Sequence, residues 1–99
     1  MGYRISHNGT ESTLSALQIE NLGLEVKRAA GFTGWRTLRP LFAPRRDGYE
    51  EIAPAQAAKY GKALLKVAGQ LPDGWDQVAR RIGESAERAA RVNEPWVWS

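Results

Sequence analysis

The sequence predicts a helix-dominant α+β domain, in which three to four helices pack with a small sheet formed by short N- and C-terminal strands. Two observations support this prediction. Apolar residues recur at spacings of three and four in three long segments, which is the period of an amphipathic helix. Residues 3–6 and 96–98 alternate in polarity, which is typical of a β-strand. If the terminal strands do not form, the alternative is an all-α bundle.

Bulk properties predict one soluble cytoplasmic domain spanning residues 1–99. The 99 residues are 42% apolar and 25% charged, which is ordinary for a globular domain. The chain has no cysteine, and small secreted domains usually depend on disulfides, so we expect a reducing compartment. No apolar run approaches the roughly 20 residues of a membrane span. Residues 1–10 do not resemble a secretion signal.

The first predicted helix follows the N-terminal strand and a turn at Asn8-Gly9. Ser12 is its expected N-cap, and Gly31 suits the position just after its end. An apolar stripe, widened by three further leucines, is expected to face the core: Ala16, Ile19, Leu22, Val26, Ala29, with Leu14, Leu17 and Leu24.

The middle of the chain predicts a short helix, a short strand and a longer helix. Trp35, Leu38 and Leu41 have helical spacing, although Pro40 argues against a long helix. The short strand is expected at residues 49–52. Pro54 suits the first position of the longer helix. Its predicted core stripe, with the lysines off it, is Ala57, Tyr60, Leu64, Val67 and Leu71.

The last predicted helix begins after Asp73, which is the expected N-cap. Asn93 is expected to end it, and Pro95 prevents its continuation. In the strand that follows, Trp96 and Trp98 would share one face. The core stripe of this helix is Trp75, Val78, Ile82, Ala86 and Ala89.

The sequence contains no residue pattern typical of an active site. His7 is the single histidine, and no group of matching chemistry accompanies it at a defined spacing. Without cysteine there is no thiolate nucleophile and no cysteine-based metal site. We therefore expect no enzyme activity, no cofactor and no metal.

The net charge of +3 is concentrated in residues 26–46, which carry six basic residues and no acid. Arginine binds phosphates and aromatic rings stack on bases, so the mixture with Phe32, Trp35 and Phe42 suggests a nucleic-acid surface. The alternative is a solvated arginine face around aromatic core residues. The candidate nucleic-acid-binding residues are Lys27, Arg28, Arg36, Arg39, Arg45 and Arg46.

A second nucleic-acid hypothesis concerns residues 77–92, which are similar to a helix-turn-helix in the placement of Gly83, Ala89 and Val92. In that motif the glycine ends the first helix, and the second helix enters the major groove. Two features argue against it. Glu84 takes a position that is usually apolar, and the apolar stripe passes Gly83 without a change of phase, as one continuous helix requires.

Four tryptophans in 99 residues are unusually many. Trp35 and Trp75 are expected in the core. Trp96 and Trp98 allow two interpretations: a closing strand packed on the core, or exposed anchors for a partner, since tryptophan and arginine dominate interface hot spots.

The leading hypothesis is a small non-enzymatic regulatory or interaction protein with a protein partner. Nucleic acid is the alternative partner, a homodimer is compatible with the small core, and no membrane contact is expected. The candidate partner contacts are Arg36, Arg39, Arg45, Arg46, Trp96 and Trp98.

Short motifs mark both ends of the chain. Met1-Gly2, Ile5-Ser6-His7 and Gly9 stand at the start, and Glu94-Pro95-Trp96 and Trp98-Ser99 at the end. In these motifs the chain resembles a family of short uncharacterised proteins from Streptomyces-type actinobacteria or their phages. The resemblance implies an actinobacterial cytoplasm and carries over no functional residue, because it brings no known activity with it.

Overall fold

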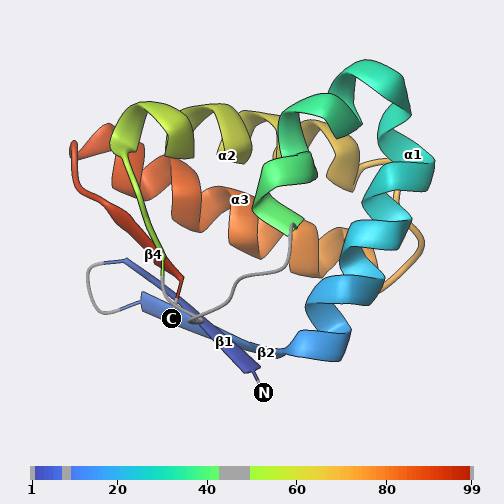
Figure 1. Cartoon of the computed structure of the whole chain (residues 1–99), viewed down its shortest axis with the longest axis horizontal. Coiled ribbons are helices and arrows are strands. Elements are labelled where there is room, and N and C mark those ends of the chain that lie inside the picture. Colours follow the sequence, from blue (N-terminus) through green and yellow to red (C-terminus); the bar gives the residue numbers. More distant parts are fainter. Residues whose placement is uncertain (1, 8–9, 43–49, 99) are drawn as a thin grey trace.

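The computed structural model describes residues 2–7, 10–42 and 50–98. Within these residues four short strands form one sheet and three helices pack with it, which confirms the helix-dominant α+β class (Figure 1). The elements in chain order are β1 (Gly2–His7), β2 (Thr10–Ser15), α1 (Ala16–Phe42), β3 (Glu50–Ile52), α2 (Pro54–Ala68), α3 (Trp75–Arg91) and β4 (Trp96–Trp98).

The sheet has the strand order β2-β1-β4-β3, and all neighbouring strands are antiparallel. The two terminal strands pair as predicted, with Ile5 opposite Trp98. In the β1–β2 pair His7 lies opposite Thr10, so the two strands are linked by two residues. These are Asn8 and Gly9, and the turn predicted there lies outside the described residues.

The start of α1 differs from the prediction. Ser12 is not a helix N-cap, because it lies within β2 and pairs with Ile5 of β1. The cap is Ser15, whose Oγ accepts from the backbone N–H of Gln18 at 3.1 Å. The side chain of Gln18 accepts in return from the N–H of Ser15 at 2.8 Å, which completes a capping box. The pairing of β1 with β2 therefore delays the helix by three residues.

The first part of α1 buries a narrower stripe than predicted. Ile19, Leu22 and Val26 are buried, whereas Leu17 and Leu24 are exposed by 64% and 55%. Residues two positions apart lie on nearly opposite sides of a helix, so Leu17 and Leu24 point away from the face that Ile19 and Leu22 bury.

Gly31 divides α1 into two limbs, residues 16–30 and 32–42. Its φ of 72° and ψ of −177° are not helical, which agrees with the predicted helix end. Figure 1 shows the second limb turning back from the first towards the middle of the molecule. The limbs contact one another where a Cβ on Gly23 would lie 3.3 Å from the Cβ of Phe42. The helix break thus brings the basic second limb over α2.

Helices α2 and α3 pack along each other, and α3 also contacts the sheet (Figure 1). The contact is close at two glycines. A Cβ on Gly61 would lie 2.9 Å from the carbonyl oxygen of Gly83, and a Cβ on Gly83 would lie 3.2 Å from that of Gly61. The predicted stripe of α2 is buried, including Tyr60 and Leu64. Gly83 therefore permits close helix packing and does not break a helix.

The ends of α3 follow two different patterns. Asp73 is not the N-cap, which is Gly74 with a φ of 97°. The N–H of Gly74 instead donates to Oδ1 of Asp76 at 3.1 Å. At the other end Asn93 has a φ of 58°, its N–H donates to the oxygen of Ala90, and the next N–H donates to the oxygen of Ala89. This is a Schellman motif, and it confirms that Asn93 ends the helix.

Trp96 and Trp98 are fully buried in the core between the sheet and α3. Their rings make an edge-to-face contact with centroids 5.5 Å apart. The Nε1–H of Trp96 donates to Oγ of Ser85 on α3 at 3.0 Å, and Ser85 is itself buried. The closing-strand interpretation is correct, and the prediction that these tryptophans contact a partner is wrong, because β4 presents both of them to the core.

Candidate binding surface

Within the described residues, the cations of the basic segment 26–46 lie on two limbs of α1, on either side of the break at Gly31. Lys27 and Arg28 lie exposed on the first limb, where Arg28 pairs with Oε1 of Glu25 at 3.5 Å. Arg36 and Arg39 lie exposed on the second limb. The remaining two candidates, Arg45 and Arg46, lie outside the described residues.

Phe32 is the most unusual side chain of the second limb, because 84% of it is exposed. It borders a shallow hollow of about 540 Å³, which we call the Phe32 hollow. Trp35 lies in the same hollow, but its ring stacks on Phe42 with centroids 6.1 Å apart and an interplanar angle of 13°. The ring of Trp35 is therefore half-buried, whereas that of Phe32 is free. The hollow is lined by Phe32, Trp35, Arg36, Arg39 and Pro40.

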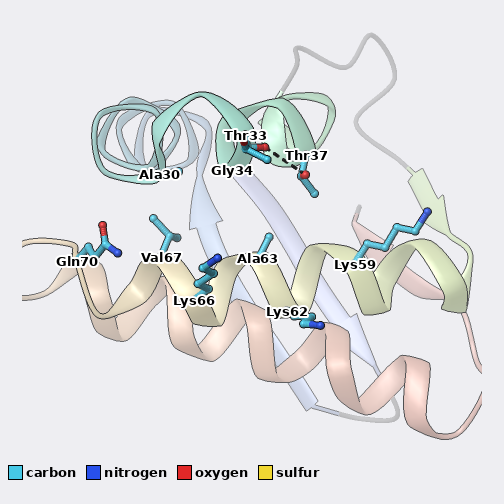
Figure 2. A pocket seen from close by; sticks show the side chains of 10 residues that line it. All are labelled: Ala30, Thr33, Gly34, Thr37, Lys59, Lys62, Ala63, Lys66, Val67 and Gln70. Atoms are coloured by element: carbon cyan, nitrogen blue, oxygen red, sulfur yellow. Dashed lines mark hydrogen bonds between the residues drawn. The ribbon is translucent and has the colours of Figure 1, made fainter.

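A second depression lies between the second limb of α1 and α2 (Figure 2). We call it the α1–α2 groove, and its volume is about 430 Å³. Figure 2 shows Ala63 and Val67 pointing from α2 towards α1, where Thr33 and Thr37 lie on the facing wall. The groove thus has an apolar floor and polar walls. Its lining residues are Ala30, Thr33, Gly34, Thr37, Lys59, Lys62, Ala63, Lys66, Val67 and Gln70.

The charge of the α1–α2 groove has one sign. Lys59, Lys62 and Lys66 are exposed and follow each other at spacings of three and four, so they share one face of α2. Residues 54–68 contain no acid. None of the three lysines forms an ion pair with another described residue. The positive charge of this face is therefore not compensated within the part of the chain that the structure describes.

The groove and the Phe32 hollow lie on different sides of the second limb and share no lining residue. Arg36 lines the hollow and follows Thr33 of the groove by three positions, so these two residues are neighbours on the helix surface. Among the described residues, the lining of the two depressions contains five cations and no carboxylate. An anion placed across this surface would meet ammonium and guanidinium groups from two helices.

Only part of this surface was predicted from the sequence. Arg36, Arg39 and Phe32 were candidates, and the structure brings them together. The three lysines of α2 were noted only as lying off the core stripe. The feature that could have identified them is a helix with three cations on one face and no acid, because a solvated helix face usually mixes both signs.

The helix-turn-helix hypothesis for residues 77–92 is wrong. α3 runs without a break from Trp75 to Arg91, and Gly83 lies inside it with no positive φ. The glycine is explained by the close approach of α2, so no separate recognition helix follows it.

The described residues offer no metal centre. They contain no group of three or more His, Asp or Glu side chains that could hold a metal ion. The side chain of His7 lies outside what the structure describes. Among the described residues, no helix is long and apolar enough to cross a membrane.

Comparison with known families gives a match over nearly the whole chain. Residues 6–99 match the model of DUF7739, which is described as a domain of unknown function. The chain belongs to the DUF7739 family. No curated protein and no solved structure matches it. Family membership agrees with the expected likeness to uncharacterised proteins and assigns no role to any residue, so the functional argument rests on the geometry of the surface.

Proposed function

We propose that this DUF7739 domain is a non-catalytic nucleic-acid-binding protein that uses the α1–α2 groove together with Arg36 and Arg39. The observation that carries the proposal is the set of five cations, drawn from two helices, that line the two depressions without a carboxylate among the described residues. Phosphate groups bind such a surface because lysine and arginine replace the counterions of the polyanion, and release of those counterions favours the complex.

The two walls of the groove suit a phosphate backbone in different ways. The ammonium groups of Lys59, Lys62 and Lys66 are spread over about 10 Å of helix axis, so they can meet more than one phosphate. The opposite wall carries the hydroxyl of Thr33, and hydroxyls are common donors to phosphate oxygens, whereas the hydroxyl of Thr37 donates to the backbone oxygen of Thr33 at 3.4 Å (Figure 2). Contacts of this kind fix the position of a nucleic acid without reading its sequence.

Fluorescence anisotropy of labelled mixed-sequence DNA and RNA, titrated over a series of salt concentrations, tests the proposal. We expect the logarithm of the binding constant to fall with the logarithm of salt with a slope of about −2 to −4, as expected for two to five phosphate contacts. A variant with Lys59, Lys62 and Lys66 changed to glutamine should reduce the steepness of this slope by about two.

The matched control removes the same charge from a different surface. Arg80, Arg81 and Arg91 are exposed on α3, and their change to glutamine alters the net charge equally. We expect this control to bind nearly as tightly as the unchanged protein. Absence of binding at low salt, or an equal loss in both variants, would contradict the proposal, because the first excludes the partner and the second excludes the surface.

A protein partner is the second candidate, and the exposure of Phe32 favours it. A phenylalanine that is 84% exposed beside Arg36 and Arg39 has the composition of an interface hot spot. Sedimentation of the protein over a range of concentrations tests the simplest case, a homodimer. Self-association that Phe32→Ser abolishes and that salt does not weaken would favour this candidate over nucleic acid.

Two further properties belong to the proposal. The lack of cysteine supports action in a reducing cytoplasm. The likeness to actinobacterial or actinophage proteins supports a host or phage of that group as the source.

A further inference from the structure

We infer that the nucleic acid taken by this surface is single-stranded, with an unpaired base stacked on the ring of Phe32 and the sugar-phosphate chain running past Arg36 into the α1–α2 groove. The inference rests on the proposed function and goes beyond it, because it names the form of the nucleic acid and the residue that selects it.

The ring of Phe32 is uncovered in the structure. It is 84% exposed, and it makes no ring contact with another described residue, unlike Trp35 on Phe42 and Trp96 on Trp98. Exposure of a whole phenyl ring is unfavourable in water. A nucleobase is a flat partner that would cover it, and base-aromatic stacking contributes about 1–3 kcal/mol per base in proteins that bind single strands.

The ring of Phe32 lies in the same hollow as two cations, Arg36 and Arg39. Phe32 directly precedes Thr33 of the groove wall, and Arg36 lies one helical turn beyond both. A strand with its base on Phe32 would therefore place its next phosphates near Arg36 and Arg39, and Thr33, which neighbours Arg36 on the helix surface, leads from there to the groove. This combination of a stacking ring with neighbouring cations is typical of sequence-tolerant single-strand binding.

The surface does not suit a nucleic-acid duplex. Bases of a duplex are paired and stacked within the helix, so their faces are not available to Phe32. Proteins that read the major groove insert a projecting helix. Helix α3 does not project in this way, because it packs against both α2 and the sheet. A duplex would use the cations alone and leave the phenyl ring uncovered.

Competition between single-stranded and duplex forms of one oligonucleotide tests the inference. The probes are labelled DNA and RNA of about 16 nucleotides, the upper end of the site sizes of small single-strand-binding folds. We expect single strands to bind at least about 10-fold more tightly than the duplex, with a loss of about 5- to 150-fold on Phe32→Leu, as for one stacked base. F32W should retain the affinity, and F32L should leave the salt slope unchanged.

The outcomes separate the inference from the proposed function. Equal affinity for single strands and duplex, or a loss in F32L that is the same for both forms, would overturn the inference and leave nucleic-acid binding in place. Absence of binding by every probe would overturn both. Thermal melting of F32L and F32W checks folding, and because Phe32 is exposed, both should melt within a few degrees of the unchanged protein. Preference for RNA over DNA single strands would identify the sugar and would support the inference.

Discussion

Helices α2 and α3 pack along each other and are similar in length, yet they differ in what surrounds them. α3 contacts both α2 and the sheet, and most of the residues it buries are small, among them Ala79, Gly83, Ser85 and Ala86. α2 packs on α3 with one side and borders the α1–α2 groove with the other. Helix α3 is therefore the central helix of the core, whereas one long face of α2 remains at the surface.

The polar residues of the two helices differ in the same sense. α3 carries four arginines and three acids, which can compensate one another at spacings of three and four. α2 carries three lysines and no acid, so its charge is compensated only by something outside the helix. The comparison indicates that changes in the buried face of α3 should affect stability, whereas changes in the polar face of α2 should affect binding.

The largest effect is expected where β4 joins α3. Trp96→Ala removes a fully buried ring and should lower the free energy of unfolding by about 3–5 kcal/mol. Urea unfolding followed by circular dichroism measures it. Phe32→Ala is the control with an exposed ring, and it should change the free energy by less than about 0.5 kcal/mol. Equal losses in the two variants would mean that the burial of the two rings is not as described.

The contact between the helices themselves gives the next effect. Gly61→Ala places a methyl group 2.9 Å from the backbone oxygen of Gly83, so α2 and α3 must separate. We expect a net loss of about 1–3 kcal/mol, even though alanine favours the helix by about 1 kcal/mol. Gly69→Ala is the control, because its Cβ would meet nothing within 4 Å and its φ of −66° suits alanine. If Gly61→Ala left the free energy of unfolding unchanged, the two helices would not be in close contact there.

Much of this helical framework could be predicted from the sequence, because it depends on local patterns. The stripes of α2 and α3, Pro54 at a helix start and Asn93 at a helix end all act within a few residues. β2 could not be predicted, because residues 10–15 show no apolar alternation and form a strand by pairing with β1. The capping box of Ser15 and Gln18 was present in the sequence and was missed because Ser12 was preferred.

The candidate surface depends on contacts that sequence spacing does not contain. Gly31 predicted where α1 breaks, but not that the second limb returns over α2 and encloses the groove. Composition likewise cannot separate Trp96 from Phe32, since both are large aromatic residues. The position of each residue within its element decides between them. Trp96 lies opposite Ile52 on the core side of the sheet, whereas Phe32 begins a helical limb whose buried face is formed by Leu38 and Leu41.

A smaller effect is expected at the hydrogen bond between β4 and α3. Ser85→Ala leaves the buried Nε1–H of Trp96 without its acceptor and should cost about 1–2 kcal/mol. In the Trp96→Phe background the indole donor is absent, so the same change at Ser85 should cost clearly less. Double-mutant analysis of urea unfolding measures the difference. Additive losses would show that the 3.0 Å contact contributes nothing to stability.

The smallest effect on stability, and the sharpest contrast with α3, is expected on the polar face of α2. Changing Lys59, Lys62 and Lys66 together to glutamine should leave the free energy of unfolding within about 0.5 kcal/mol, because all three are exposed and none forms an ion pair with a described residue. Relief of repulsion between the lysines would shift it upwards, most clearly at low salt. The matched change of Arg80, Arg81 and Arg91 should lower it by a few tenths of a kcal/mol, since Asp76 and Glu87 each precede one of these arginines by four positions. Unfolding at two salt concentrations compares the two variants. A larger loss of unfolding free energy in the lysine variant would mean that this face of α2 stabilises the fold and is not a binding surface for an anion.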